Sequence, residues 1–214
     1  MSKTRERILD ASLELFNRQG ERSITTNHIA AHLQMSPGNL YYHFRNKQQI
    51  IAELFAAYEA QIELSLSLPQ DRALTVEDKR HYLESLVGCL WNYRFLHRDL
   101  EHLLSCDSQL SEDYRAFSRR CVERGRAIYA GLVSAGILCP ERTVPEALAV
   151  NAWLILTGWV GYLCTSVLDS AQDELTRPML RQGVYQVLAL ELGLVSEAAR
   201  GEVQALLADY LRAE

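Results

Sequence analysis

The sequence predicts an all-α fold. Apolar residues recur at helical spacing in almost every segment, and no stretch alternates apolar and polar residues as a half-buried strand does. Glycine and proline separate the segments, and the chain contains no internal repeat. With 214 residues, 48% of them hydrophobic, it can bury the core of one or two domains.

Two amphipathic helices are expected in the N-terminal third. The first runs from about residue 4 to residue 19, ends at Gly20, and turns three apolar residues to one face: Leu9, Leu13 and Phe16. The second begins near Asn46 or Lys47 and carries a long apolar row: Ile50, Ile51, Leu54, Phe55, Tyr58 and Ile62. This long helix is expected to join an N-terminal head to the rest of the chain.

Between them, residues 25–47 predict two short helices joined by a tight turn. Thr25 or Thr26 caps the first, and Ser36-Pro37 starts the second with a capping residue and a proline at the first helical position. A helix-turn-helix unit needs a small residue where its helices cross, an apolar residue in the turn and another inside the second helix, and Ala30, Met35 and Leu40 supply these. Gln34 occupies the usual glycine position of the turn, so the turn either accepts a positive φ there, at a cost on the order of 1 kcal/mol, or has a slightly different shape.

The second short helix presents an unusual face. Leu40 and Phe44 are four residues apart and point to one side, so Tyr41, Tyr42 and His43 are pushed toward solvent. Stability gives no reason to expose these rings, whereas a partner surface does. The pattern fits a recognition helix lying in a DNA major groove.

After a linker at residues 65–75, the rest of the chain predicts further helices, at about 76–96, 98–105, 111–135, 144–168, 177–192 and 196–211. The expected organisation is an N-terminal three-helix DNA-binding domain at residues 1–47 and a C-terminal helical domain at residues 48–214. The net charge differs between the two ends of the chain. Residues 1–50 have a net charge of +3, which leaves −8 for the remainder of a chain of net charge −5. A basic head on an acidic body limits DNA contact to one end.

Several classes of protein are not supported by the sequence. Five cysteines without a C-x-x-C pair predict reduced, mostly buried thiols of a cytoplasmic protein, with Cys139 the candidate for a reactive one. His97 and His102 are five residues apart and diverge on a helix, so no metal site is expected. No nucleophile elbow, phosphate loop or H-E-x-x-H motif is present, so neither an enzyme nor a cofactor is predicted.

Residues 147–168 contain no charged side chain over 22 positions. Their length alone would permit a membrane span. Polar residues interrupt the run, acidic residues border it, and no Lys or Arg cluster flanks it. We therefore expect no membrane segment but a helix that is buried on nearly all sides.

Residues 5–51 resemble the N-terminal domain of the TetR family of bacterial regulators. The resemblance is carried by ILDASLELF, Gly20, ITTNHIA and, above all, MSPGNLYYHFRNKQQII. It implies DNA contacts by nine residues: Thr26, Asn27, Pro37, Gly38, Asn39, Tyr41, Tyr42, His43 and Lys47. Asn39 would read adenine, His43 and Lys47 would hold phosphates, and Lys3, Arg5 and Arg7 could add phosphate or minor-groove contacts.

For the body, the resemblance implies a homodimer that pairs its last helices in a four-helix bundle. It also implies a pocket for a small apolar or aromatic effector, with seven candidate residues: Trp91, His102, Tyr114, Phe117, Cys121, Asn151 and Trp153. The predicted function is a dimeric repressor released from a palindromic operator by that effector. The alternative is an architectural or protein-partner-regulated DNA-binding factor on the same fold, without a small-molecule effector.

Overall fold

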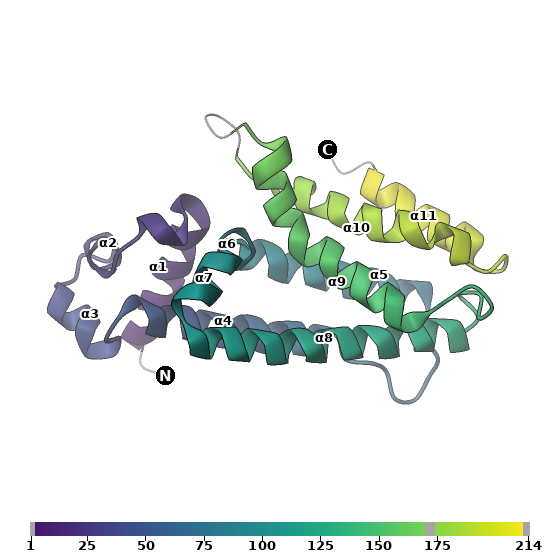
Figure 1. Ribbon diagram of the computed structural model, residues 1–214, viewed down its shortest axis with the longest axis horizontal. Coiled ribbons are helices and arrows are strands. Elements are labelled where there is room, and N and C mark those ends of the chain that lie inside the picture. Colours follow the sequence, from purple (N-terminus) through teal and green to yellow (C-terminus); the bar gives the residue numbers. More distant parts are fainter. Residues whose placement is uncertain (1–2, 170–173, 212–214) are drawn as a thin grey trace. The chain divides into compact units, whose positions relative to one another are not determined.

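The computed structural model describes residues 3–169 and 174–211, and it confirms the all-α prediction (Figure 1). The described residues form no β-strand, and a single antiparallel bridge joins Leu138 to Val195. The elements in chain order are α1 (Lys3–Gln19), η1 (Glu21–Ser23), α2 (Thr26–His32), α3 (Pro37–His43), α4 (Lys47–Ser65), α5 (Val76–Asn92), α6 (Arg94–Arg98), α7 (Leu100–Cys106), α8 (Ser108–Ser134), α9 (Pro145–Tyr162), η2 (Leu163–Val167), α10 (Arg177–Glu191), η3 (Leu192–Leu194) and α11 (Arg200–Leu211).

The expected helices are present, with several of their ends shifted. α8 begins at Ser108 rather than at about residue 111, and α11 begins at Arg200 rather than at about residue 196. The helix expected at 76–96 ends at Asn92, and the short α6 follows it after Tyr93. The helix expected at 144–168 is α-helical only as far as Tyr162 and continues through Val167 as a π-helical turn. Gly20 ends α1 as predicted, with a positive φ of 84° that a side chain would disfavour.

The chain divides into two compact units that share two helices. The first unit comprises residues up to Gln61 together with Asn92–Tyr114, and the second comprises Ile62–Trp91 and the residues from Arg115 onward. α4 and α8 each contribute to both units. The boundary predicted between residues 47 and 48 lies at the start of α4. The division into a DNA-binding domain and a regulatory domain at this point stays a prediction.

In the first unit, α1 packs against α2 and α6. Its buried face is formed by Ile8, Leu15 and Phe16. The expected face was wrong in part, because Leu9 and Leu13 are only half-buried. The predicted apolar row of α4 is confirmed in full, since all six of its residues are buried.

In the second unit, α10 packs against α9 and α11 around a buried polar cluster. Glu191 accepts a hydrogen bond from the hydroxyl of Tyr129 at 2.5 Å and pairs with the ammonium of Lys79 at 2.5 Å. Burial raises the pKa of Tyr129 well above its usual value, and the neighbouring carboxylate adds to the shift. Because every charge in this cluster has a partner, the buried ion pair is tolerated.

The expectation that residues 147–168 are buried on nearly all sides was wrong. Residues 145–167 are long and apolar enough to cross a membrane by length and composition, yet the apolar window is only 28% buried. Val150, Leu154 and Tyr162 on α9 are exposed. The uncharged residues of this helix therefore form both a part of the core and an apolar surface that no other described segment covers.

Candidate nucleic-acid interface

Local signals position α2 and α3. Thr25 caps α2, accepting a hydrogen bond from the backbone N–H of His28, and Ser36 caps α3 in the same way through Asn39. Pro37 occupies the first turn of α3, where a missing N–H costs nothing. Both predicted helix starts are thus confirmed.

The turn between α2 and α3 closes over Gln34. Gln34 has a φ of 54° and is the only residue other than glycine with a positive φ in the described part of the chain. Its N–H donates to Ala31 O at 3.1 Å, and the N–H of Met35 donates to Ala30 O at 3.0 Å. These two bonds form a Schellman motif, in which a left-handed residue follows the helix. Of the two possibilities for this turn, the structure therefore has the strained one, with Gln34 at a positive φ.

α3 has one buried side and one open side. Leu40 and Phe44 are fully buried, as their spacing predicted. Tyr42 is 84% exposed and Tyr41 is 46% exposed. Pro37, Gly38 and Asn39 are also exposed, whereas His43 is half-buried, so the open face lies toward the start of the helix. A helix held by two apolar anchors thus offers two tyrosines and a carboxamide to a partner.

The C-terminal end of α3 is tied down by Arg5. Its guanidinium donates to the backbone carbonyl of His43 at 2.5 Å, forms an ion pair with Glu53, and lies 4.1 Å from the centre of the Phe44 ring. Arg5 was expected to contact DNA, but these contacts occupy it inside the first unit. It positions α3 against α1 and α4 instead, while Lys3 and Arg7 are exposed.

One further contact lies on the N-terminal side of the interface. The hydroxyls of Thr26 and Tyr41 lie 3.1 Å apart, so α2 steadies the ring that α3 presents. Asn27 is exposed beside Thr26 at the start of α2.

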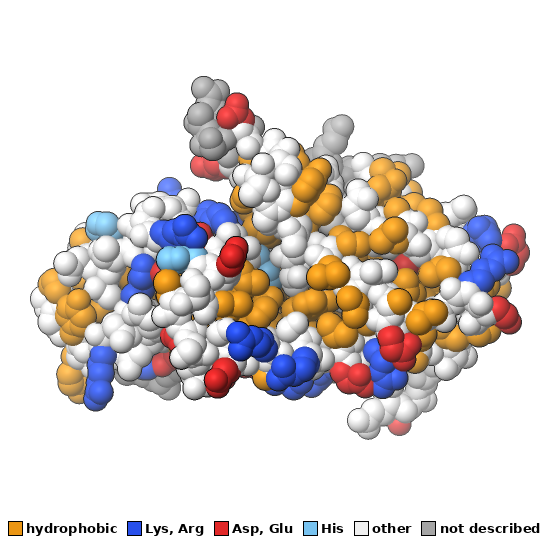
Figure 2. Space-filling model, viewed as in Figure 1, with side chains coloured by type: hydrophobic (Ala, Val, Ile, Leu, Met, Phe, Trp, Pro, Cys, Tyr) orange, Lys and Arg blue, Asp and Glu red, His pale blue; other side chains and the backbone are white. Residues whose placement is uncertain are grey.

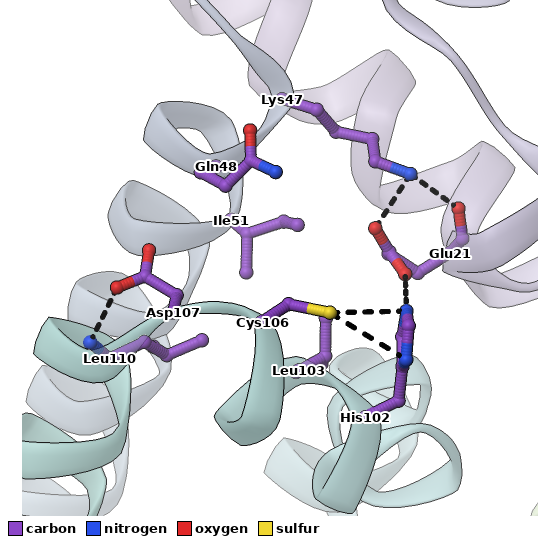
Figure 3. Close-up of a pocket in the computed structure, with 9 residues that line it drawn as sticks. All are labelled: Glu21, Lys47, Gln48, Ile51, His102, Leu103, Cys106, Asp107 and Leu110. Atoms are coloured by element: carbon purple, nitrogen blue, oxygen red, sulfur yellow. Dashed lines mark hydrogen bonds and ion pairs between the residues drawn. The ribbon is translucent and has the colours of Figure 1, made fainter.

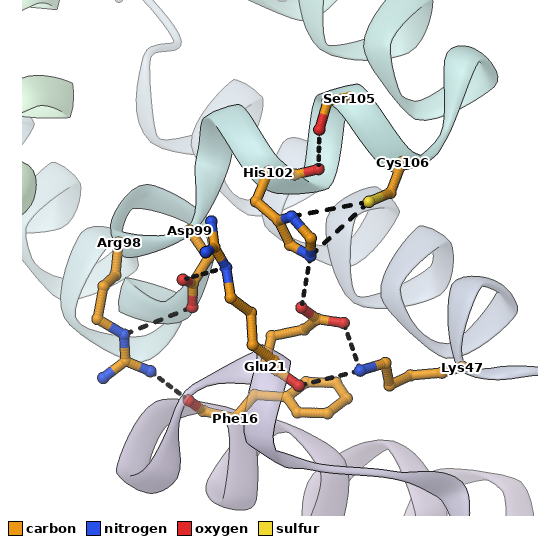
Figure 4. A network of polar contacts seen from close by, with 9 residues as sticks. Phe16, Glu21, Lys47, Arg98, Asp99, His102, Ser105 and Cys106 are labelled. Carbon is orange, nitrogen blue, oxygen red and sulfur yellow. Dashed lines mark hydrogen bonds and ion pairs between the residues drawn. The ribbon is translucent and has the colours of Figure 1, made fainter.

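Lys47 is held by oxygen atoms of the same unit. Its ammonium lies 2.6 Å from the Glu21 carboxylate and donates to the carbonyl of Glu21 at 3.0 Å (Figure 4). It also donates to the carbonyl of Ile24 at 2.9 Å. The three protons of the ammonium are therefore used, and a phosphate would have to displace one of these partners. Arg45, which is not among the residues predicted to contact DNA, is an exposed cation two residues after the end of α3.

Comparison with known proteins matches almost the whole chain. Residues 8–54 match the model for bacterial regulatory proteins of the tetR family, and residues 57–203 match the TetR model described as a bacterial transcriptional repressor. The chain belongs to the TetR family. TetR-family proteins are DNA-binding transcription factors rather than enzymes. Residues 25–47, which contain α2, the turn and α3, lie inside the region that matches the N-terminal model and form its helix-turn-helix.

Individual relatives agree with this assignment. A TetR-family regulator from Marinobacter aquaeolei VT8 is 48% identical, with a TM-score of 0.89 over 98% of this chain and 99% of that one. The regulator AcrR of Shigella flexneri is 32% identical over 90 residues, which are 39% of this chain and 42% of AcrR. This TetR-family chain thus spans less than half of AcrR. A regulator encoded in the dhlA 5′ region of Xanthobacter autotrophicus is 25% identical over 83% of this chain and 89% of that protein.

The seven candidate effector residues of this TetR-family chain are divided between its two units. His102 and Tyr114 belong to the first unit, and the other five belong to the second. Within the second unit, the rings of Phe117 and Trp153 meet edge to face at 5.8 Å. Asn151, which is exposed, lines a different and very small cavity beside Tyr129 and Glu191. Sequence spacing gave no sign of that buried Tyr129–Glu191 pair, whose members are 62 residues apart.

Proposed function

We propose that this TetR-family chain is a homodimeric repressor that reads a palindromic operator with α3 and is released by a small effector. The exposed face of α3 is the observation that carries the proposal. A carboxamide can pair with adenine through two hydrogen bonds, which makes Asn39 the leading base reader. Tyr41 and Tyr42, with Pro37 and Gly38, would contact bases and backbone beside it.

Phosphate contacts would fix the register of α3 on the duplex. Thr26 and Asn27 supply polar groups at the start of α2, and His43 and Lys47 are the further candidates implied by the family. Arg45 joins them because its side chain is exposed two residues after the end of α3. Lys47 would take part only by giving up one of its internal oxygen partners.

Dimerisation is supported by the uncovered apolar surface of α9 and α10 (Figure 2). Leu154 is 61% exposed and Leu190 is 60% exposed, and both line a groove of about 380 Å³. Gly158 in the same groove has no atom within 4 Å of the position a Cβ would occupy, so a partner helix has room to approach. Leu188 on α10 and Leu206 on α11 are buried in their own chain and are therefore not available to a partner.

A dimer also suits the proposed operator. Two symmetry-related α3 helices would read two half-sites about 34–36 Å apart, or a multiple of that spacing. Because a two-fold axis would relate the two subunits, the two half-sites would have the same sequence and together form a palindrome.

The effector is proposed to be a small apolar or aromatic molecule bound in the body. SmeT, a protein of the same fold with 21% identity and a TM-score of 0.62, was solved as a complex with triclosan. An effector releases the operator only if it binds more tightly to the conformer that does not bind DNA. A cytoplasmic location follows from this function, because the operator lies there.

Substitutions on α3 test the proposal. Asn39→Ala and Tyr42→Ala should lose operator affinity, measured by fluorescence anisotropy, while circular dichroism and sedimentation stay unchanged. Leu64→Ala is the matched control, because Leu64 is an exposed apolar residue of α4 in the second unit. Equal affinity of Tyr42→Ala, Asn39→Ala and the control would exclude α3 as the reader.

A further inference from the structure

A row of four polar side chains in the first unit ends at a thiol. Lys47 pairs with Glu21, the second oxygen of Glu21 faces His102, and the imidazole lies beside the sulfur of Cys106 (Figure 4). Both imidazole nitrogens are 3.7 Å from Sγ. Cys106 is the last residue of α7 and is exposed.

Glu21 is the buried member of this row. Its side chain is only 5% exposed, and Oε1 lies 2.6 Å from the ammonium of Lys47. Oε2 has no hydrogen-bond partner among the described residues and lies 4.0 Å from Nε2 of His102. A buried carboxylate oxygen without a donor is costly, and a proton on the facing imidazole nitrogen would supply that donor. Glu21 therefore offers an acceptor for a protonated His102.

The thiol borders a cavity of about 130 Å³ (Figure 3). Its apolar wall comes from Ile51, Leu103 and Leu110, and Gln48 and Asp107 add polar groups. Such a volume equals that of roughly four water molecules in the liquid. A small organic molecule can therefore lie next to the sulfur.

We propose that Cys106 is a site of covalent modification by small electron-poor alkenes, such as α,β-unsaturated carbonyl compounds, with His102 as its base. The thiol proton passes to Nδ1 of His102, and Nε2–H then pairs with Oε2 of Glu21. The sulfur electron pair forms a bond to the β-carbon as the carbon–carbon π bond breaks. The α-carbon takes the proton from the imidazolium, so thiol and alkene give a thioether without an oxidant or a leaving group.

The charges around the imidazole suit this step. Lys47 neutralises Glu21, so the imidazolium and the thiolate form the second balanced pair. Other charged groups nearby include Asp107, which lines the cavity, Glu101, which precedes His102 on α7, and Asp99 at the start of α7, which pairs with Arg22 and Arg98.

The other four cysteines are less exposed than Cys106. Cys89 and Cys121 are buried, and burial raises the pKa of the Cys89 thiol. Cys139 and Cys164 are half-buried. The sequence singled out Cys139 because of its loop, whereas the arrangement of His102 and Glu21 favours Cys106.

An adduct on Cys106 would push the side chain of His102 on α7 away from Glu21 in η1. Glu21 also pairs with Lys47, the first residue of α4. Because Lys47 is the first residue of α4 and α4 follows α3, we expect the adduct to lower DNA affinity. This consequence rests on the proposed function, whereas the chemistry of the thiol does not.

Limited labelling with N-ethylmaleimide at pH 7, followed by intact mass and peptide mapping, tests the chemistry. Cys106 should be labelled first, and His102→Gln should slow its labelling about tenfold, because few unassisted thiols are ionised at that pH. The difference should shrink above about pH 8.5, where thiols ionise unaided. Cys139→Ser, the matched control, should label Cys106 at the wild-type rate. Faster labelling of another cysteine, or an unchanged rate in His102→Gln, would overturn the proposal.

Operator binding tests the consequence. Labelled wild-type protein should lose at least about tenfold in affinity, whereas Cys106→Ser treated in the same way should keep its affinity. Full affinity of the labelled wild type would overturn the regulatory role. Loss of operator binding by the unlabelled protein would instead contradict the proposed function, and the mass measurement would still decide the thiol chemistry.

Discussion

Replacing Lys47 by methionine should destabilise the first unit. Methionine keeps much of the side-chain length but removes the charge, so the Glu21 carboxylate, 5% exposed, loses the cation 2.6 Å away. Two backbone carbonyls lose their donor as well. Breaking a buried pair from one side costs about 3–5 kcal/mol, and we expect about 3 kcal/mol because Lys47 retains partial exposure.

Urea unfolding at a fixed protein concentration measures this change. The double variant Glu21→Gln with Lys47→Met should recover at least half of the lost stability, because no unpaired charge is then buried. The reasoning is refuted if Lys47→Met unfolds at the wild-type urea concentration but binds DNA with a salt dependence reduced by about one. That result would make Lys47 a phosphate contact.

Three further changes test other parts of the structure. Gln34→Gly should raise the free energy of unfolding by about 0.5–1 kcal/mol by relieving the positive φ, and urea unfolding should show no such gain for Gln34→Ala. Arg72 and Thr75 hold the pKa of Asp78 well below its usual range, so its contribution is present above about pH 4 and lost as pH falls through the lowered pKa. Asp78→Asn should therefore cost about 1 kcal/mol at pH 7, and a deficit in thermal stability that stays constant down to pH 2 would contradict this. Leu154→Lys should give a monomer in sedimentation velocity, and an intact dimer would place the interface elsewhere.

Local features of the helix-turn-helix could be predicted because they depend on neighbours in sequence. The caps at Thr25 and Ser36, the buried pair Leu40 and Phe44, and the strained Gln34 all follow from spacings of a few residues. These spacings are set by helix geometry alone.

Roles that depend on distant partners could not be predicted. Arg5 and Lys47 looked like cations for DNA, yet their partners Glu53 and Glu21 are 48 and 26 residues away. The uncharged residues 147–168 could equally indicate a core or an uncovered apolar surface, since composition does not say what covers a helix. Cys106 gave no signal by itself, because its environment requires Glu21 from another element.

Selection of bound DNA from a random pool by the 214-residue chain, read by sequencing, tests the central claim most directly. The account predicts an enriched palindrome whose half-sites lie one helical turn, or a multiple of it, apart, and predicts that Asn39→Ala with Tyr42→Ala abolishes the enrichment. Enrichment of no sequence, or the same enrichment with both substitutions, would contradict a dimer that reads DNA through α3.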